Sequence, residues 1–541
     1  MFIARSCRVT LFSAALLFSA GNTAFAQKEG IKSITADELR MHLGFVASDE
    51  TEGRGTPSTG ANVVAKYLAT MAAGAGLKPI MPDGSFFQGI PITVPSVSES
   101  RSHLIIKGDA GESVFYMPKD FGGNLGRGGK VEGGILFVGC GLQGPKEGWN
   151  DFAGLDLKGK IVVALDGQVP PNHPMSTMQV RITRQMAPMM GGAAAILTVI
   201  SPQREKDLQA TLGGGLKPIL QPALEEQYQT DAINRAAVSE IQSRFPMRAD
   251  ISHAVATRIL GITEDELNAM FTSLAEGKQV PGREIPATLE LNVETDTRHD
   301  RIRNVLAVVE GTDPVLKKEY VVISAHYDHL GIRNGRTFNG ANDDGSGTAA
   351  LLEIGQALVL QRPKRSVILA WFTGEEMGLW GSNHFVNRSP VPLEAISADI
   401  NLDMIGRNDP GVLFLVGSNS LSTELDTVLQ AVSSQPLGLR LDYTYNDKNH
   451  PDRYYSRSDN YPFIRMGVPA VALFTGMTPD YHQAGDTIDK IDFAKIEKIA
   501  RFTYAAAMEI GNRPGLLKLD ADPNVTARGK QNIKPPTSPK P

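Results

Sequence analysis

The stretch SVILAWFTGEE, residues 366–376, joins an apolar run to two adjacent glutamates. Its first seven residues have the composition of a strand buried on both faces. Gly374 then frees the backbone, so the chain turns out of the strand directly before Glu375 and Glu376. Two neighbouring carboxylates at this place repel each other and are costly to ionise unless a divalent cation compensates them. Taken alone, the pair is better explained by a solvated loop with two exposed glutamates.

Strands and helices alternate on both sides of this stretch. Strands are predicted at 304–309, 320–325, 366–372, 396–403, 412–416 and 470–474, and helices at 346–359, 379–386, 423–432 and 492–510. This alternation predicts an α/β sheet covered by helices on both faces. Open sheets of this class place their sites in the loops that follow the strands.

Potential metal ligands occupy such loops. They are His326, Asp343, Glu376, Asp403 and His482. Each has a simpler explanation by itself: a His-x-Asp pair is more often a structural hydrogen bond, and one of Asp343 and Asp344 is expected to cap a helix. Five coincidences are less plausible than one two-metal site, in which the ions lie roughly 3.5–4 Å apart.

Five segments carry a family resemblance when taken together. HYDHLG, NGANDDGSG, FTGEEMGLWGS, NLDMIG and YHQAGDTIDKID, in this order, resemble the zinc exopeptidases of the bacterial leucyl aminopeptidase type, metallopeptidase family twenty-eight. The resemblance implies a mixed-sheet α/β/α sandwich with two Zn²⁺ per subunit. His326 and Asp403 would hold one zinc, Glu376 and His482 the other, and Asp343 would bridge them.

The same resemblance implies roles for three further residues. Glu375 would be the general base, taking a proton from the attacking water and returning it to the leaving amine. Tyr481 would donate to the developing oxyanion, and Asp328 would orient the ring of His326. Asn460 departs from the family, whose segment at 457–460 commonly reads Arg-Ser-Asp-His.

The chain is predicted to divide into six parts. A signal peptide covers 1–26, an N-terminal part of the peptidase domain 27–98, an inserted β-rich domain 99–220, a helical connector or lid 221–295, the peptidase core 296–512 and a disordered tail 513–541. The inserted domain resembles the protease-associated domain that some members of the family carry. The segment GCGLQG, residues 139–144, lacks the following helix of a nucleotide site and is interpreted as a turn.

Composition limits the location and the partners. The 541 residues carry a net charge of -5 without long runs of one sign, which argues against nucleic acid. Arg5 and Arg8, an apolar stretch and Ala24-Phe25-Ala26 predict a secreted or periplasmic protein cleaved after Ala26, and no segment is long enough to span a membrane.

The resulting hypothesis is an exported dizinc aminopeptidase acting on peptide substrates. Two alternatives stay open. One is a dizinc carboxypeptidase or other amide hydrolase, which shares every ligand, and the other is a non-catalytic binding protein on the same scaffold.

Overall fold

The computed structural model describes residues 30–530 except for 110, 124, 126–127, 145–148, 167–176, 213–218, 221–245 and 334. The predicted signal peptide and its cleavage site after Ala26 lie outside these residues. The chain forms two compact units, one from residues up to Ile90 together with those from Arg301 onward, and the other from Pro91 to Asp300. We call them unit 1 and unit 2. The chain passes between them within β2 (Phe87–Val97) and returns within β14 (Thr295–Val309).

Unit 1 is built on a mixed sheet. Its central strands are neighbours and parallel, in the order β18 (Ser366–Phe372), β15 (Tyr320–His326), β19 (Ile396–Leu402) and β22 (Ala470–Phe474). Strand β14 joins β18 antiparallel on one side, and β20 (Val412–Val416) joins β22 antiparallel on the other. The shorter β1 (Lys78–Pro79) pairs with β14, and β21 (Arg440–Asp442) with β20.

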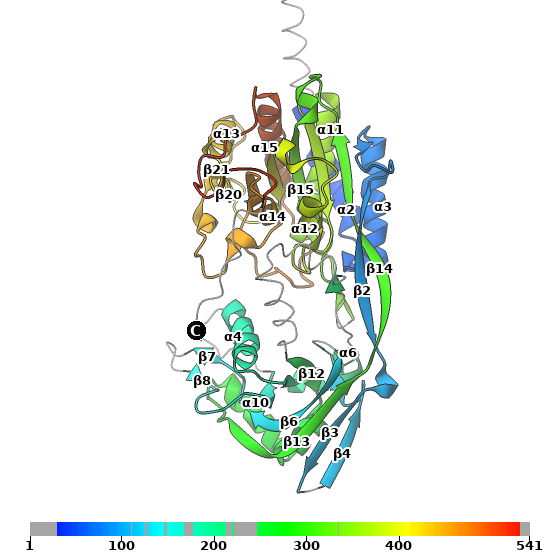
Figure 1. The fold of residues 1–541 in the computed structure, drawn as a ribbon, viewed down its shortest axis with the longest axis vertical. Helices are drawn as coiled ribbons and strands as arrows, with labels where there is room; N and C mark the ends of the chain where they lie inside the picture. Colours follow the sequence, from blue (N-terminus) through cyan, green and yellow to red (C-terminus); the bar gives the residue numbers. More distant parts are fainter. Residues whose placement is uncertain are drawn as a thin grey trace, which may run out of the picture. The chain divides into compact units, whose positions relative to one another are not determined.

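Helices cover both faces of this sheet because its central strands are apolar on both faces. Val321 and Ile323 of β15 pack into one core cluster, and Val322 between them packs into another. The first cluster contains residues of α2 (Ala36–Val46), α3 (Thr59–Gly74), α11 (Ser346–Leu360), α13 (Thr423–Ser433) and α15 (Phe493–Asn512). The second contains residues of α12 (Trp380–Asn387) and α14 (Asn460–Arg465). Figure 1 shows α11 and α15 beside β15. The predicted mixed α/β sandwich is confirmed.

Unit 2 has its own sheet, in the order β4-β3-β13-β6-β9-β10-β12-β5. Its strands are β3 (His103–Gly108), β4 (Gly111–Tyr116), β5 (Phe121–Gly122), β6 (Gly129–Phe137), β9 (Ile161–Leu165), β10 (Ala195–Val199), β12 (Met247–Ile251) and β13 (Arg283–Val293). Its helices are α4 (Thr177–Met190), α5 (Pro202–Glu205), α6 (Leu208–Leu212), α9 (His253–Leu260) and α10 (Glu264–Ala275).

The boundaries of unit 2 differ from the predicted division at residue 220. Strands β12 and β13 come from the segment predicted as a connector, yet β12 pairs with β10, and β13 pairs with both β3 and β6. Both strands bury apolar side chains in the same core as the rest of unit 2, for example Ile251 and Leu289. The described part of 221–295 therefore completes the inserted sheet.

The segment after α15 also differs from its prediction as a disordered tail. Leu517 and Val525 are buried in the cores of unit 1, at 1% and 3% exposure. The backbone N–H of Leu517 donates to Ser397 Oγ, and that of Gly529 donates to the carbonyl of Met466. These two apolar anchors hold residues 513–530 against the fold, and residues 531–541 lie outside the described part. Among the described helices, none has the length and apolar character needed to cross a membrane.

Candidate metal centre

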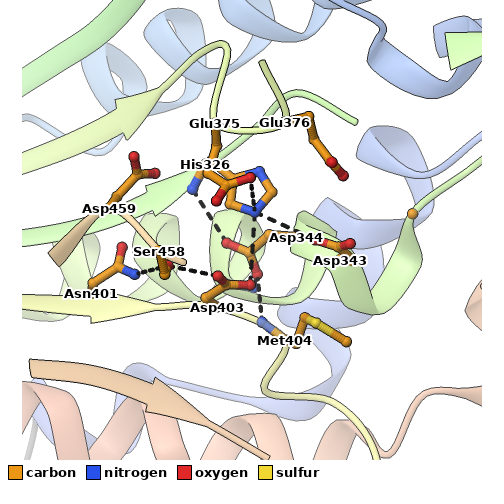
Figure 2. A network of polar contacts seen from close by, with 12 residues as sticks. His326, Asp343, Asp344, Glu375, Glu376, Asn401, Asp403, Met404, Ser458 and Asp459 are labelled. Carbon is orange, nitrogen blue, oxygen red and sulfur yellow. Dashed lines mark hydrogen bonds and ion pairs between the residues drawn. The ribbon is translucent and has the colours of Figure 1, made fainter. Parts of the chain in front are cut away.

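The predicted ligands gather at one edge of the sheet of unit 1. Figure 2 shows four of them: His326, Asp343, Glu376 and Asp403. His326 is the last residue of β15, Asp403 directly follows β19, and Glu375 and Glu376 follow β18 after the turn at Gly374. These strands are parallel, so their carboxyl ends meet at a common edge. Two further residues come from loops: Asp343 from the turn η5 (Ala341–Gly345) before α11, and His482 from the segment after β22.

Asp343 lies between two groups of side chains. Its Oδ1 is 3.4 Å from His326 Nε2, which is also 3.7 Å from Asp403 Oδ1. Its Oδ2 is 3.2 Å from His482 Nε2, which is also 3.1 Å from Glu376 Oε2. One carboxylate thus presents a separate oxygen to each histidine, which is the arrangement expected of a ligand that bridges two ions.

Several polar atoms of this centre are buried without a hydrogen-bond partner among the described residues. They include Asp343 Oδ2, Glu376 Oε1 and Asp403 Oδ1. An ionised carboxylate in such a place is costly unless a cation compensates it. Carboxylate oxygens and imidazole nitrogens are ligands that zinc accepts. The donor set therefore fits two divalent ions, one on each side of Asp343.

The pKa values follow from burial and from the neighbouring imidazoles. Burial by itself would raise the pKa of Asp343, but hydrogen bonding to His326 and His482 holds it well below its usual range. Burial and Asp343 likewise act to raise the pKa of Glu376, and contacts with the imidazoles outweigh them and lower it to about 2. Both carboxylates are therefore charged at neutral pH, as ligands must be.

Glu375 differs from its neighbour Glu376. Its Oε2 lies 4.0 Å from His326 Nε2, on the His326 side of the centre. Burial raises its pKa well above the usual range, and the carboxylates of Glu376 and Asp459 add to the effect against the opposing influence of His326. A carboxylate with such proton affinity beside the predicted ligands is suited to accept and return a proton.

The sequence leaves open which of Asp343 and Asp344 caps the helix and which is available as a metal ligand, and the structure distinguishes the two. Asp344 points away from the histidine groups and accepts from the backbone N–H groups of His326, Gly347 and Met404 at 3.0–3.3 Å. It therefore satisfies the first turn of α11 and ties this helix to the ends of β15 and β19. Asp343 is left free for the centre.

Asp328 orients two members of the centre, by a route other than the predicted one. Nδ1 of His326 is 3.1 Å from the backbone oxygen of Asp328 and 3.7 Å from its carboxylate. The Asp328 carboxylate instead accepts from the backbone N–H of Glu375, at 3.1 Å. Asp328 thus fixes the imidazole through its carbonyl and Glu375 through its side chain.

Tyr481 stacks on the ring of His482, with the ring centroids 3.8 Å apart. Its hydroxyl oxygen accepts from Arg457 Nη2 at 2.7 Å. Burial raises the pKa of Tyr481, so the phenol keeps its proton. Since Arg457 occupies one lone pair of the oxygen, the O–H is available to donate elsewhere, as the predicted oxyanion role requires.

A cavity of about 60 Å³ opens beside these residues. One side is polar and is formed by members of the centre together with Arg457 and Tyr481. The other side is formed by Met404, Val416, Tyr454, Ala472, Phe474 and Met477. The centre therefore adjoins a small and largely apolar recess.

His329 belongs to the centre and was not singled out from the sequence. Its side chain is fully buried, and its Nδ1 lies 3.0 Å from Glu376 Oε1 and 3.8 Å from Asp343 Oδ2. Neither ring nitrogen has a well-aligned hydrogen bond with the described residues. The signal available was a second histidine in HYDHLG, three residues after His326.

Arg54 and Asp486 shape the loop that carries Asp343. The guanidinium of Arg54 is fully buried and donates to the carbonyls of Tyr327 and Gly340, among others. The Asp486 carboxylate accepts from the backbone N–H groups of Asn342 and Asp343. Arg54 was not predicted, because its segment has the composition of an ordinary loop.

Comparison with known proteins identifies relatives of this part of the chain. Residues 304–507 match the model of Peptidase family M28. Leucine aminopeptidase 2 of Trichophyton rubrum is 26% identical over 299 residues, covering 51% of this chain and 55% of that protein. The probable leucine aminopeptidase 2 of Aspergillus oryzae is 32% identical over 247 residues, covering 40% and 48%. The chain thus spans about half the length of these curated relatives.

Two solved structures share the fold over most of their length. One is BSAP, a zinc aminopeptidase from Bacillus subtilis, at 16% identity and a TM-score of 0.53, covering 90% of this chain and 98% of that one. The other is an aminopeptidase from Aneurinibacillus sp. strain AM-1, at 19% and 0.52, covering 92% and 98%. At such identities the likeness concerns the fold alone. The assignment of the inserted unit as a protease-associated domain stays a prediction.

Proposed function

Through residues 304–507 this chain belongs to peptidase family M28, and on that premise we propose that it is a zinc-dependent aminopeptidase that releases N-terminal residues from peptides. The relatives named leucine aminopeptidase support this activity. The observation that carries the proposal is the position of Asp343, which offers one oxygen to each of two histidine groups.

The proposal assigns two zinc ions to the centre. His326 and Asp403 would hold one ion, Glu376 and His482 the other, and Asp343 would contact both. Zinc supplies a Lewis acid there, which polarises the scissile carbonyl and acidifies water. The oxygens of Asp343, Glu376 and Asp403 that lack a well-aligned hydrogen bond with the described residues support this assignment, because they are buried and available as ligands.

Glu375 would move the proton of the reaction. It accepts a proton from the attacking water and delivers it to the amine that leaves. Its raised pKa and its place beside His326 support this role. The backbone N–H of Glu375 donates to the Asp328 carboxylate, and this contact supports a fixed position for the base. Tyr481, held by Arg457, would donate to the oxygen that becomes negatively charged.

The recess suits one apolar side chain at the cleaved position. A cavity of about 60 Å³ has room for a single side chain, which fits removal of one residue at a time. Its wall of Met404, Phe474 and Met477 favours an aliphatic group through burial of apolar surface.

Carboxypeptidase action is the second candidate, and one observation favours it. Arg457 lines the same cavity and is the single arginine or lysine among its described lining residues. A guanidinium at this place is a potential partner for a C-terminal carboxylate. Its hydrogen bond to Tyr481 argues instead for a role in positioning the phenol.

Blocked substrates separate the two activities. The zinc-loaded protein is assayed with leucine anilide, N-acetyl-leucine anilide, and peptides with free or amidated C-termini. Aminopeptidase action predicts release from every substrate with a free N-terminus and none from the acetylated ones. Cleavage that tolerates acetylation but requires a free C-terminus would replace the proposal with a carboxypeptidase. The Glu375→Gln variant, measured in parallel, shows that the activity belongs to this centre.

Export is part of the proposal and is supported by the sequence of residues 1–26. Expression of the full chain with its own N-terminus, followed by mass spectrometry of the exported fraction, tests it. The expected product begins at Gln27. An uncleaved chain retained in the cytosol would contradict export without affecting the enzymatic proposal.

A further inference from the structure

Unit 2 contains a cavity of about 320 Å³ on one face of its sheet. Strands β9, β10 and β12 are adjacent and parallel there. Their register aligns side chains in two rows across the sheet, Val162 with Ile196 and Arg248, and Ala164 with Thr198 and Asp250. All six line the cavity. Helix α4 contributes Arg184 and Pro188 to the same lining.

The two faces of these strands differ in character. Val163, Leu197 and Ala249 alternate with the residues of the rows and are buried in the main apolar core of unit 2. The cavity face carries two charged residues on β12, Arg248 and Asp250, where a strand inside a sheet usually carries apolar ones. Because these two residues break the apolar pattern, we interpret the cavity face as suited to binding a polar group.

Arg248 differs from the other arginines that line the cavity. Arg204 is paired twice, with Asp166 at 2.8 Å and with Asp250 at 2.5 Å. Arg184 donates to the carbonyl of Cys140 at 2.9 Å. Arg248 makes no hydrogen bond or ion pair with any described residue, and burial lowers its pKa without a carboxylate to oppose the effect.

The remaining wall is apolar. It consists of Val138, Phe152, Val162, Leu165, Pro188 and Ile196. Small-molecule sites combine such walls with a few polar groups that fix orientation, in volumes of roughly 300–1,000 Å³. The cavity is at the lower end of that range. It is bordered by Asp166, directly after β9, and so reaches the carboxyl end of the parallel strands, where open sheets bind ligands.

We propose that this cavity binds a small organic acid, with its carboxylate on the guanidinium of Arg248 and its apolar body against Val162, Ile196 and Phe152. A guanidinium pairs with a carboxylate through two parallel hydrogen bonds, which recovers the cost of holding the charge out of water. The proposal concerns unit 2 and does not depend on the reaction assigned to unit 1.

Two sources present the same chemistry. One is a free acid of the size of an acylated amino acid, and the other is the C-terminal residue of a peptide. Both offer one carboxylate next to an apolar side chain. The probes are N-acetyl-L-leucine, N-acetyl-alanyl-alanyl-leucine and N-acetyl-L-leucinamide, in which the acetyl group blocks aminopeptidase cleavage and the amide removes the carboxylate.

Isothermal titration of the zinc-loaded full chain measures their binding. We expect N-acetyl-L-leucine to bind and the amide to bind roughly tenfold more weakly or not at all. Arg248→Gln should weaken binding of the acid by a similar factor, whereas binding at the zinc centre of unit 1 would be unaffected by it. Arg258→Gln is the matched control, because Arg258 lies on α9 of the same unit and donates to Ser113 and Gly111 outside the cavity. Tighter binding of the tripeptide than of N-acetyl-L-leucine identifies a peptide C-terminus as the source, and equal or weaker binding identifies a free acid.

A second variant separates binding from folding. Arg248→Met removes the unpaired charge and keeps the length of the side chain, so the unliganded protein should unfold at the same temperature or higher while binding is lost. Equal binding of acid and amide, full binding by Arg248→Gln, or a lower unfolding temperature of Arg248→Met would each overturn the proposal. The last result would show that Arg248 already has a partner within the fold.

Discussion

The two units carry charged side chains of opposite sign on or beside the parallel strands of their sheets. In unit 1, buried oxygens of Asp343, Glu376 and Asp403 lack a well-aligned hydrogen bond with the described residues at the carboxyl ends of such strands. In unit 2, the guanidinium of Arg248, near the start of β12, has no hydrogen bond or ion pair with any described residue. Because a buried charge is costly without an opposite one, its sign indicates the class of ligand. Unit 1 is suited to cations and unit 2 to an acid.

The two places also differ in how the charges are held. In unit 1 they come from loops after three different strands and from the turn before α11, and Asp344, Asp328 and Asp486 fix the backbone around them. In unit 2, Arg248 stands on the strand itself and is fixed only by register. Catalysis needs several side chains in different roles, and the centre of unit 1 brings several together. A single oriented charge, as in unit 2, is enough to bind a ligand.

Removal of the bridging carboxylate should have the largest effect. Asp343→Ala takes one oxygen from each of the two groups, so we expect loss of both zinc ions and a fall in kcat/KM of roughly 10⁴-fold or more. Metal analysis after dialysis and steady-state kinetics measure the two effects. Asp265→Ala is the control, since Asp265 is an exposed carboxylate of α10 in unit 2. Two equivalents of retained zinc would remove Asp343 as the bridge.

Loss of the base should affect turnover and spare the metals. Glu375→Gln keeps the size of the side chain and its backbone contact with Asp328, but it cannot accept the proton. We expect two bound zinc ions and a kcat lowered roughly 10²- to 10⁴-fold with a smaller change in KM. Near-normal hydrolysis by this variant would mean that another group carries the proton. The contrast with Asp343→Ala separates holding the cations from using them.

The sequence predicted the site of unit 1 well because its residues follow recognisable strands. The run 366–372 is bounded by the same residues in the structure as in the prediction. Each proposed ligand lies within a few residues of such a strand or of a glycine-rich turn, so the topology alone brings them to one edge. His329 and Arg54 were missed because their roles depend on packing: a buried ring against Glu376 and a guanidinium that satisfies distant carbonyls.

Unit 2 was less predictable for a physical reason. Its strands β12 and β13 follow a long stretch of chain, and they pair with strands far from them in sequence. Local periodicity does not specify such partners. The tail prediction differed for a similar reason, since few apolar residues anchor residues 513–530: Leu517 and Val525 are buried, and Leu519 is partly buried against the core. A few buried apolar residues change the composition of such a segment too little to predict that it is ordered.

Burial should keep the imidazole of His384 in α12 neutral, and its titration tests this expectation. It is 6% exposed, and burial together with the nearby Arg388 lowers its pKa from 6.5 to about 4. The unfolded chain therefore binds more protons than the folded one between these values. The neutral state of His384 therefore contributes roughly 3 kcal/mol to the free energy of unfolding above pH 6.5. This contribution is lost as the pH falls to 4.

The measurement compares urea unfolding of wild type and His384→Gln from pH 7.5 to 4.5, in chelating buffer so that zinc release does not contribute. We expect the free energy of unfolding of the variant to fall less steeply below pH 6.5. Parallel curves would show that His384 does not titrate in this range. That outcome would contradict the expectation that burial keeps the His384 imidazole neutral.

His329 allows the smallest and most selective test of the metal centre. Its Nδ1 lies next to Glu376 Oε1, while Glu376 Oε2 faces His482, so His329 holds the carboxylate in the orientation that the second group requires. His329→Ala should lower the affinity for the zinc on the His482 side roughly 10- to 100-fold and leave the affinity for the ion on the His326 side unchanged. Competition titration with a zinc chelator resolves the two affinities, and His450→Ala, in a loop outside the described centre, serves as the control. Equal weakening of both ions would place His329 in general support of the loop that carries Asp343, and no weakening would leave Glu376 oriented by His482 alone.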